Sequence, residues 1–294
     1  MCPTENTRNG TTCGVVTLYS PPDACLKNIE TYIAYIDKLY IIDNTNCPDT
    51  NLHKELENRF GKTELLSYGK NLGIAAALNL AIKKGLACGY DWLLTMDQDS
   101  FFDDIQAKKF FASLTTIEKK TVAIVSPAHQ KNTDDNNTCI YVRKDEVMTS
   151  GNLLNLSLTK KIGLFNEDLF IDSVDHDYCL RTNLAGFYVL QATNCFIQHQ
   201  VGNCFSGSFL FGMKKKSFLI HSPKRMYFII RNGQYIINKY QKDFPSYTKA
   251  LQRHINVRIS RCLRYSKNRR TYFKYIVKGL IDYKLNRFGN RVNI

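Results

Sequence analysis

The 294-residue sequence lacks several features that would assign it to a class at once. No apolar run reaches the roughly 18 residues that a membrane-spanning helix needs. The N-terminus has no basic stretch followed by an apolar one, so we expect no secretory signal peptide. None of the ten cysteines forms a CxxC pair, which argues against a zinc ribbon and is typical of scattered, reduced cytosolic thiols. We also find no internal repeat.

Acidic residues are scarce in the last third of the chain. Residues 201–294 hold 21 Lys and Arg but only Asp243 and Asp282, a net charge of +19, whereas residues 1–200 carry a net charge of −5. Hydrophobic residues make up 44% of the sequence and charged residues 22%, which is compatible with a packed core and excludes global disorder. This asymmetry indicates a near-neutral body and a basic tail that faces an anionic partner, either nucleic acid or a membrane surface.

The first hundred residues alternate between strand and helix patterns. Apolar strand-like runs at 13–19, 38–42, 64–68 and 90–96 are separated by segments with helical spacing of apolar residues. Such a series predicts an α/β fold with a parallel sheet covered by helices. Ligands of such sheets bind beyond the carboxyl ends of the strands. The polar residues at or just after these ends are Thr17, Tyr19, Asp43, Asn44, Asn71, Asp97 and Asp99.

The segment Asp97-Gln98-Asp99 ends an apolar strand. Alternate residues of an extended segment point the same way, so the two carboxylates can converge on one cation. Their oxygen atoms suit Mg²⁺ or Mn²⁺ shared with substrate phosphates. A solvated turn at the end of the strand is the alternative.

Two further groups of residues suggest chemistry. Asp172, Asp175 and Asp177 lie close together in FIDSVDHDYCLR, where one could act as a general base and others could cap a helix. His199 follows an apolar stretch; it is structural unless the fold brings it to Asp99, where a neutral imidazole could be a third metal ligand.

Together these motifs resemble inverting family 2 glycosyltransferases with the GT-A fold, and within them the bacterial rhamnosyltransferases. That pattern includes N-x-G-I-A-x-A-x-N, D-Q-D-S, F-I-D-x-V-D followed by L-R, and H-x-x-G, and all four occur here in order. The resemblance covers about residues 13–202, with a weaker echo at HSPKRMYFIIRN. It implies a Rossmann-like, mostly parallel sheet flanked by helices. It also implies a nucleotide-sugar-binding catalytic domain over 1–204 and a basic, mostly helical region over 205–294.

The resemblance also implies roles for individual residues. Asp175 would be the catalytic base, supported by Asp177 and Arg181, and Asp99 the main metal ligand, with Asp97 near the metal or the ribose and His199 at the metal or the diphosphate. Residues lining the nucleotide or the two sugars would be Thr17, Tyr19, Asp43, Asn44, Asn71, Gly73, Asn79, Ser150, Gly151 and Asn152.

The implied reaction is a single displacement with inversion. The base takes a proton from an acceptor hydroxyl, which attacks the anomeric carbon opposite the leaving nucleotide diphosphate, while Mg²⁺ or Mn²⁺ stabilises the diphosphate. The implied donor is dTDP-β-L-rhamnose. The implied acceptor is a cell-surface glycan on a polyprenyl diphosphate lipid.

The basic tail then has an expected use. We expect it to form helices that bind the anionic inner face of the bacterial plasma membrane peripherally, from the cytoplasm. Lys224, Arg225 and Arg231 are the candidates for gripping an acceptor diphosphate. A solvated basic helical face is the plain alternative.

Other functions stay open at this point. A nucleic-acid-binding protein would explain the tail but would leave the Asp motifs without a role, and no nucleic-acid-binding signature is present. A nucleotidyltransferase would need a Gly-rich, Lys-containing phosphate loop, which TLYSPPD is not. A family 2 enzyme that uses a UDP-hexose is the nearest alternative.

Overall fold

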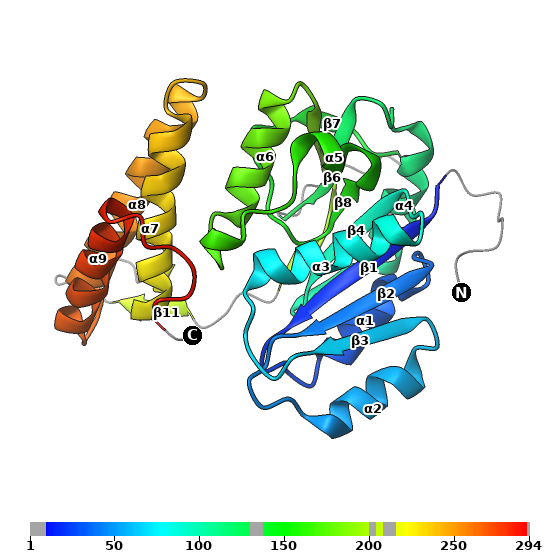
Figure 1. The fold of residues 1–294 in the computed structure, drawn as a ribbon, viewed down its shortest axis with the longest axis horizontal. Coiled ribbons are helices and arrows are strands. Elements are labelled where there is room, and N and C mark those ends of the chain that lie inside the picture. The colour runs from blue at the N-terminus through cyan, green and yellow to red at the C-terminus, as the bar shows by residue number, and fades with distance from the viewer. Residues whose placement is uncertain (1–9, 130–137, 200–203, 208–215, 293–294) are drawn as a thin grey trace. The chain divides into compact units, whose positions relative to one another are not determined.

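The computed structural model describes residues 10–129, 138–199, 204–207 and 216–292. The chain divides into two compact units (Figure 1). The first contains residues up to 167 together with 174–199, and the second contains 168–173 and the chain from 200 onward. The second unit therefore includes a short segment from well before the predicted boundary at 204.

An eight-stranded sheet forms the centre of the first unit, with the strand order β3-β2-β1-β4-β8-β6-β9-β7. Its strands are β1 (Thr12–Leu18), β2 (Lys38–Asp43), β3 (Thr63–Ser67), β4 (Trp92–Asp97), β6 (Val122–Ala128), β7 (Tyr141–Arg143), β8 (Asn152–Asn155) and β9 (Tyr188–Phe196). A separate two-stranded pair joins β5 (Ser100–Phe101) to β10 (Gln198–His199).

The half of the sheet from β3 to β4 is entirely parallel, as the alternating strand and helix pattern predicts. Beyond β4 the sheet is mixed, because β8 runs antiparallel to both β4 and β6, and β7 runs antiparallel to β9. The two strands β6 and β9 are again parallel. The expected α/β fold is confirmed, with an antiparallel strand inserted beside β4.

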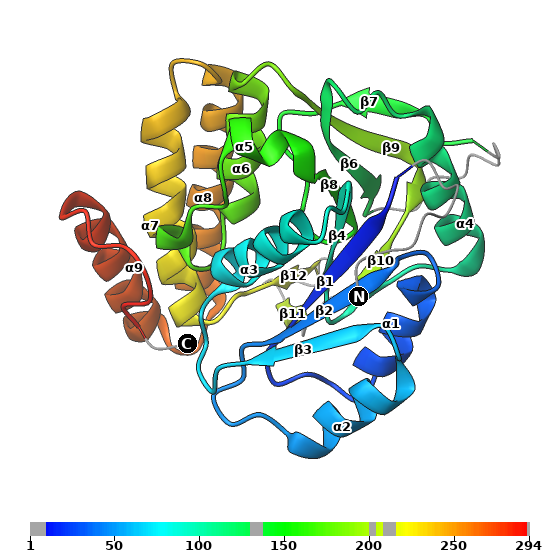
Figure 2. The same ribbon diagram turned by 45° about the vertical axis from the view of Figure 1, so that its right-hand side comes forward.

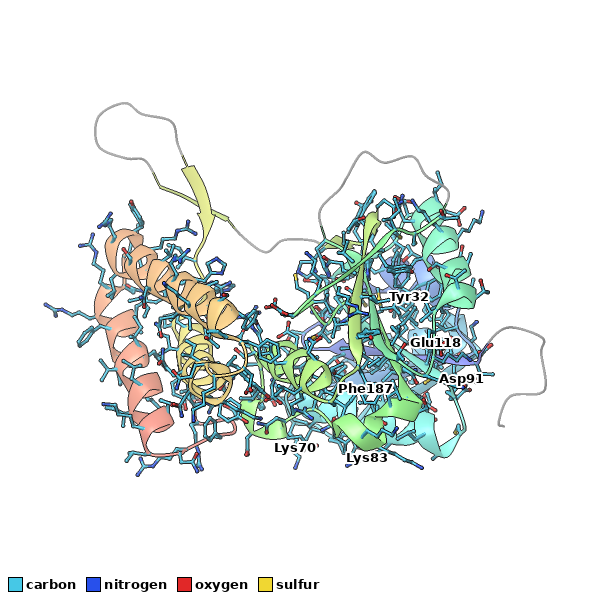
Figure 3. The ribbon with its side chains drawn as sticks, turned by 90° about the horizontal axis from the view of Figure 1, so that it is seen from above. Tyr32, Lys70, Lys83, Asp91, Glu118 and Phe187 are labelled. Atoms are coloured by element: carbon cyan, nitrogen blue, oxygen red, sulfur yellow. The ribbon has the colours of Figure 1, made fainter. Side chains whose placement is uncertain are left out.

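Helices cover both faces of this sheet (Figure 2). They are α1 (Cys25–Ile33), α2 (Thr50–Arg59), α3 (Ile74–Ala87), α4 (Asp104–Ser113), α5 (Thr159–Ile162) and α6 (Val174–Leu184). Successive residues of a strand point to opposite faces. Val16 accordingly packs in the cluster that contains Ile29 of α1 and Phe110 of α4. Cys13, three residues earlier and on the opposite face, lies against Gly85 of α3. Figure 3 shows Tyr32 inside this unit and Lys83 at its edge.

In the described ranges, the second unit contains the segment 168–173, a hairpin and three long helices. The hairpin pairs β11 (Cys204–Gly207) with β12 (Lys216–Leu219). The helices are α7 (Pro223–Tyr240), α8 (Pro245–Tyr265) and α9 (Arg269–Lys284), which pack on one another around Ile230, Ile255 and Ile276. Ser222 caps α7 by accepting a hydrogen bond from the Arg225 amide, with Pro223 in the first turn. No helix in the described ranges is both long and apolar enough to cross a bilayer.

Candidate active site

The carboxyl end of β4 holds a compact group of metal-ligand side chains. Asp97, Asp99 and His199 each offer one ligand atom, and these atoms lie within 4.8 Å of one another. The Nδ1 atom of His199 lies 3.2 Å from Oδ1 of Asp99. Two carboxylates and an imidazole suit Mg²⁺ or Mn²⁺, so the residues present fit the expected cation.

Strand pairing brings His199 to this place from a hundred residues away. The two-residue strands β5 and β10 pair His199 with Ser100, directly after the DQD segment. Ser100 is fully buried, and its Oγ lies 2.9 Å from His199 Nδ1, a hydrogen bond that orients the imidazole. The sequence predicted a functional role for His199 only if the fold brought it close to Asp99. The structure meets this condition.

Thr17 and Tyr19, at the end of β1, lie beside the same group. Thr17 is in register with Asp97, and its hydroxyl oxygen is buried without a hydrogen-bond partner in the described part of the chain. The side chain of Gln98 joins the two strand ends, since its Oε1 accepts from the Tyr19 amide at 2.8 Å and its Nε2 donates to the Tyr19 carbonyl. Gln98 stands inside the metal motif, yet its residue type alone predicts no such contact.

A second strand end shapes the turn that leads into α3. Asn44 is buried, and its amide donates to the Gly73 carbonyl while its oxygen accepts from the Leu72 amide. Asn71 accepts from the Gly73 amide at 2.9 Å. Gly73 has φ +84°, which only glycine adopts freely, so this turn depends on it. Asn44 and Asn71 therefore hold the shape of the expected nucleotide-binding edge.

Asp43 is also buried and fully engaged. One carboxylate oxygen accepts from the Thr45 amide at 2.8 Å, and the other lies 2.7 Å from Nε2 of His53 on α2. The carboxylate thus fixes the loop after β2 before any ligand is present.

The turn before β8 connects the metal-ligand group to α6. The amide of Asp97 donates to Ser150 Oγ, and the amide of Gly151 donates to the Thr95 carbonyl at 2.7 Å. Gly151 has φ +84°, and a Cβ on it would lie 2.7 Å from Cγ of Pro127. No side chain fits at this position, so the turn can sit against β4 only with glycine.

Asp175 lies in the first turn of α6 and is partly exposed. It shares a cavity of about 10 Å³ with Thr149 and Asn152 of the turn before β8. That space is about the size of one water molecule. Oδ1 of Asn152 is buried there without a hydrogen-bond partner among the described residues. The expected base and the expected sugar-side residue therefore face the same small space.

Asp177, two residues further along α6, is placed differently. It is completely buried and accepts a hydrogen bond from Arg181 Nε at 2.8 Å. The other guanidinium nitrogens of Arg181 donate to the carbonyls of Ile162 and Leu164. Asp177 and Arg181 thus hold the loop in front of α6, the supporting role that the resemblance implies.

Asn79 was expected among the ligand-binding residues, and its environment does not fit that expectation. It is buried, its Nδ2 donates to the Phe165 carbonyl and to Glu167 Oε1, and its Oδ1 accepts from the Phe165 amide. These contacts use the amide group to tie α3 to the 165–167 loop, so Asn79 has a structural role.

Arg231 requires the same correction, because it is fully buried in the second unit. Its guanidinium donates to protein oxygens, including the carbonyls of Asp168, Leu169 and Gly289, so it does not offer a surface grip for a diphosphate. Arg225 is about half exposed and contacts Asp172 at 3.2 Å. Gly202 of the H-x-x-G motif and the basic residues Lys214 and Lys215 lie outside the described residues.

His129 could not be predicted as a site residue from the sequence, because a single histidine after a strand carries no distinctive signal. It follows β6, whose last residue, Ala128, pairs with Phe196 three residues before His199. Both ring nitrogens are buried without a hydrogen-bond partner in the described ranges. Burial, reinforced by the nearby His199, lowers the pKa of His129 to about 4, so the imidazole is neutral near pH 7.

The chain is similar to known bacterial transferases, although no family model matches it. It is 26% identical over 249 residues to the dTDP-rhamnosyl transferase RfbF of Shigella flexneri, covering 79% of this chain and 81% of that protein. A shorter match of 116 residues, 30% identical, joins it to the galactofuranosyltransferase GlfT1 of Mycobacterium tuberculosis and covers 38% of each protein.

Solved structures share the fold at low sequence identity. The crystal structure of GalNAc-T7 with UDP, GalNAc and Mn²⁺ aligns with a TM-score of 0.59 at 11% identity, over 96% of this chain and 58% of that one. Residues 1–349 of Staphylococcus aureus TarS align with a TM-score of 0.54 at 11% identity, over 93% of this chain and 80% of that one.

The fold, the Asp-Asp-His group at the strand ends and these similarities define the class of the protein. It is a glycosyltransferase with the GT-A fold. Over most of its length the sequence is similar to a dTDP-rhamnosyl transferase. The expected fold and enzyme class are therefore confirmed.

Proposed function

We propose that the chain transfers L-rhamnose from dTDP-β-L-rhamnose to a hydroxyl of a lipid-linked cell-surface glycan, with inversion at the anomeric carbon. The observation that carries this proposal is the grouping of Asp97, Asp99 and His199 at the carboxyl end of β4. The similarity to a dTDP-rhamnosyl transferase over most of both chains supports the choice of donor.

The proposed base is Asp175. Its side chain is partly open to solvent, and we expect an acceptor hydroxyl to approach it from that side. Oδ of Asp175 accepts the proton as that hydroxyl attacks the anomeric carbon. Asn152, whose buried Oδ1 has no hydrogen-bond partner among the described residues, would orient the same hydroxyl or the donor sugar.

Asp99, Asp97 and His199 would hold Mg²⁺ or Mn²⁺. The cation would stabilise the charge on the leaving diphosphate, which removes the need for a second carboxyl group as acid. Ser100 keeps His199 turned toward Asp99 through its hydroxyl.

The nucleotide would lie along the ends of β1 and β2. Thr17 offers a buried hydroxyl and Tyr19 an exposed ring to the base and ribose. Asn44, Asn71 and Gly73 would bind mainly through the turn that they hold in place. Asp43 would act in the same indirect way.

The acceptor lipid would place the enzyme at the inner face of the bacterial plasma membrane. On α9, Phe273, Leu280 and Ile281 are exposed on one side of the helix, and Lys274 and Lys284 lie beside them. Exposed apolar side chains among cations suit the interface of an anionic bilayer. Lys224 and Arg225 remain the proposed contacts for an acceptor diphosphate, with no role for nucleic acid.

Liposome flotation tests the membrane proposal. The protein should float with vesicles in proportion to their anionic lipid content, and salt should weaken the binding. A variant with Phe273, Leu280 and Ile281 replaced by Gln should lose binding. Ile105→Gln, which changes an apolar side chain that is 75% exposed in the first unit, should keep it. Equal flotation of both variants would contradict the proposal.

Nucleotide-diphosphate release from a panel of nucleotide sugars tests the donor. We expect release from dTDP-rhamnose in preference to UDP-glucose, UDP-galactose and UDP-N-acetylglucosamine, and loss of release when a divalent cation is withheld. Preference for a UDP-hexose would keep the enzyme class and overturn the donor.

A further inference from the structure

The segment that leads to the proposed base belongs to the second unit. Residues 168–173 pack with the C-terminal helices, whereas α6, which begins at Val174, belongs to the first unit. Phe170, Asp172 and Ser173 have φ values of 64°, 62° and 63°, in the left-handed region that side-chain-bearing residues seldom adopt. Such a backbone persists only where its surroundings hold it.

Asn232 of α7 provides one part of that hold. Its side chain is completely buried, and its Nδ2 donates to the carbonyls of Leu169 at 2.8 Å, Ile171 at 2.8 Å and Asp172 at 2.9 Å. These are three of the carbonyl groups that the left-handed bend turns away from ordinary secondary structure. A buried carbonyl without a partner would destabilise the bend.

Arg231, the preceding residue, provides the second part. Its Nη2 donates to the carbonyls of Asp168 and Leu169, both at 3.2 Å, and its Nη1 to the carbonyl of Gly289 at 2.6 Å. Its Nε donates to Oδ1 of Asn232 at 2.9 Å, so the two side chains act as one group.

The side chains of the segment are held as well. Phe170 stacks on Phe228 with 5.5 Å between ring centroids, and Asp172 contacts Arg225. All of these partners are on α7. One helix therefore fixes both the backbone and the side chains of residues 168–173.

We propose that Arg231 and Asn232 are positioning residues for the proposed base. They fix the left-handed bend at 170–173, and Asp175 follows that bend by two residues. The inference rests on the assignment of Asp175 as base, and it gives the C-terminal unit a part in catalysis without contact with the reacting atoms.

The test compares Asn232→Ala with Cys262→Ala. Cys262 is equally buried in the C-terminal helices but packs in the cluster around Ile230 and Ile255, away from the 168–173 segment. Both variants remove buried contacts, so the comparison separates loss of stability from loss of positioning. We measure thermal midpoint, kcat and KM with dTDP-rhamnose, and hydrogen exchange of peptides that cover 168–173.

We expect Asn232→Ala to lower kcat at least about 10-fold, to leave KM for the donor within about twofold, and to speed exchange in 168–173. Cys262→Ala should change neither kcat nor this exchange. Arg231→Lys keeps the positive charge but loses the planar guanidinium group that donates several hydrogen bonds. If Asn232→Ala does not fold, Arg231→Lys should show the same lower kcat with an unchanged KM for the donor.

Unchanged kcat with faster exchange would overturn the positioning role, as would an equal loss of kcat in Cys262→Ala. Hydrogen exchange can be measured without an activity assay. It therefore reports whether α7 stabilises residues 168–173 even if Asp175→Asn proves fully active. In that case the assignment of the base fails, separately from the structural hold.

Discussion

Two carboxylates of α6 should respond to removal in opposite ways. We predict that Asp177→Ala destabilises the fold strongly, whereas Asp175→Ala leaves stability nearly unchanged and removes activity. Asp177 is completely buried and bound to Arg181, while the Asp175 side chain is 23% exposed. Both residues are aspartates in the first turn of α6.

The magnitude follows from the Asp177–Arg181 pair. Removing one partner of a buried ion pair costs about 3–5 kcal/mol. Because the Arg181 side chain keeps 21% exposure and two carbonyl partners, we expect a loss of about 2–3 kcal/mol in the free energy of unfolding. At about 2–4 °C per kcal/mol, the thermal midpoint should fall by roughly 4–12 °C.

Thermal unfolding followed by circular dichroism measures both variants. Asp175→Ala should melt within about 4 °C of the wild type and above Asp177→Ala, since a partly exposed carboxylate near a helix start contributes about 0.3–1 kcal/mol. Equal midpoints for the two variants, or a larger loss in Asp175→Ala, would refute the argument from burial.

Three further predictions concern the site and the second unit. Asp99→Ala or excess EDTA should abolish turnover while the fold survives, and full activity in EDTA would remove the metal from the account. Gly151→Ala should cost about 1–3 kcal/mol and impair turnover, because the new Cβ meets Pro127 at 2.7 Å in a left-handed backbone, whereas Gly61→Ala, with nothing within 4 Å, should do neither. Burial and two neighbouring arginines lower the pKa of His221 to about 4, so below pH 6.5 the unfolded chain takes up a proton that the folded chain does not. Stability should therefore fall as the pH drops from 6.5 toward 4, by up to about 1.4 kcal/mol per pH unit from this group, and denaturation curves of His221→Gln should show a shallower fall than the wild type.

The strand and helix series up to β4 could be predicted because it depends on local patterns. Apolar runs followed by polar turns mark β1, β2 and β4, and their carboxyl ends meet at one edge of the sheet. The antiparallel insertion of β8 could not be predicted, since its neighbours β4 and β6 are fixed by long-range pairing. Nothing in the four residues Asn152–Asn155 indicates either partner.

Residue type was a good guide to candidates and a poor guide to what each one touches. Asn79 and Arg231 looked like ligand contacts because amides and guanidinium groups bind ligands well, but burial commits both to protein carbonyls. Gln98 and Asn232 were not predicted as important, because their residue types suggest no particular contact. Their roles depend on backbone groups that lie 79 and 60–63 positions away in the sequence.

The central claim is that Asp175 is the base of a metal-dependent transfer, and one comparison tests it most directly. Donor binding by calorimetry and single-turnover rates are measured for Asp175→Asn and for Asp172→Asn, whose carboxylate contacts Arg225. We predict that Asp175→Asn binds dTDP-rhamnose as the wild type does and turns over at least about 10²-fold more slowly, with Asp172→Asn the milder change. Near-normal turnover in Asp175→Asn, with the larger loss in Asp172→Asn, would contradict the account.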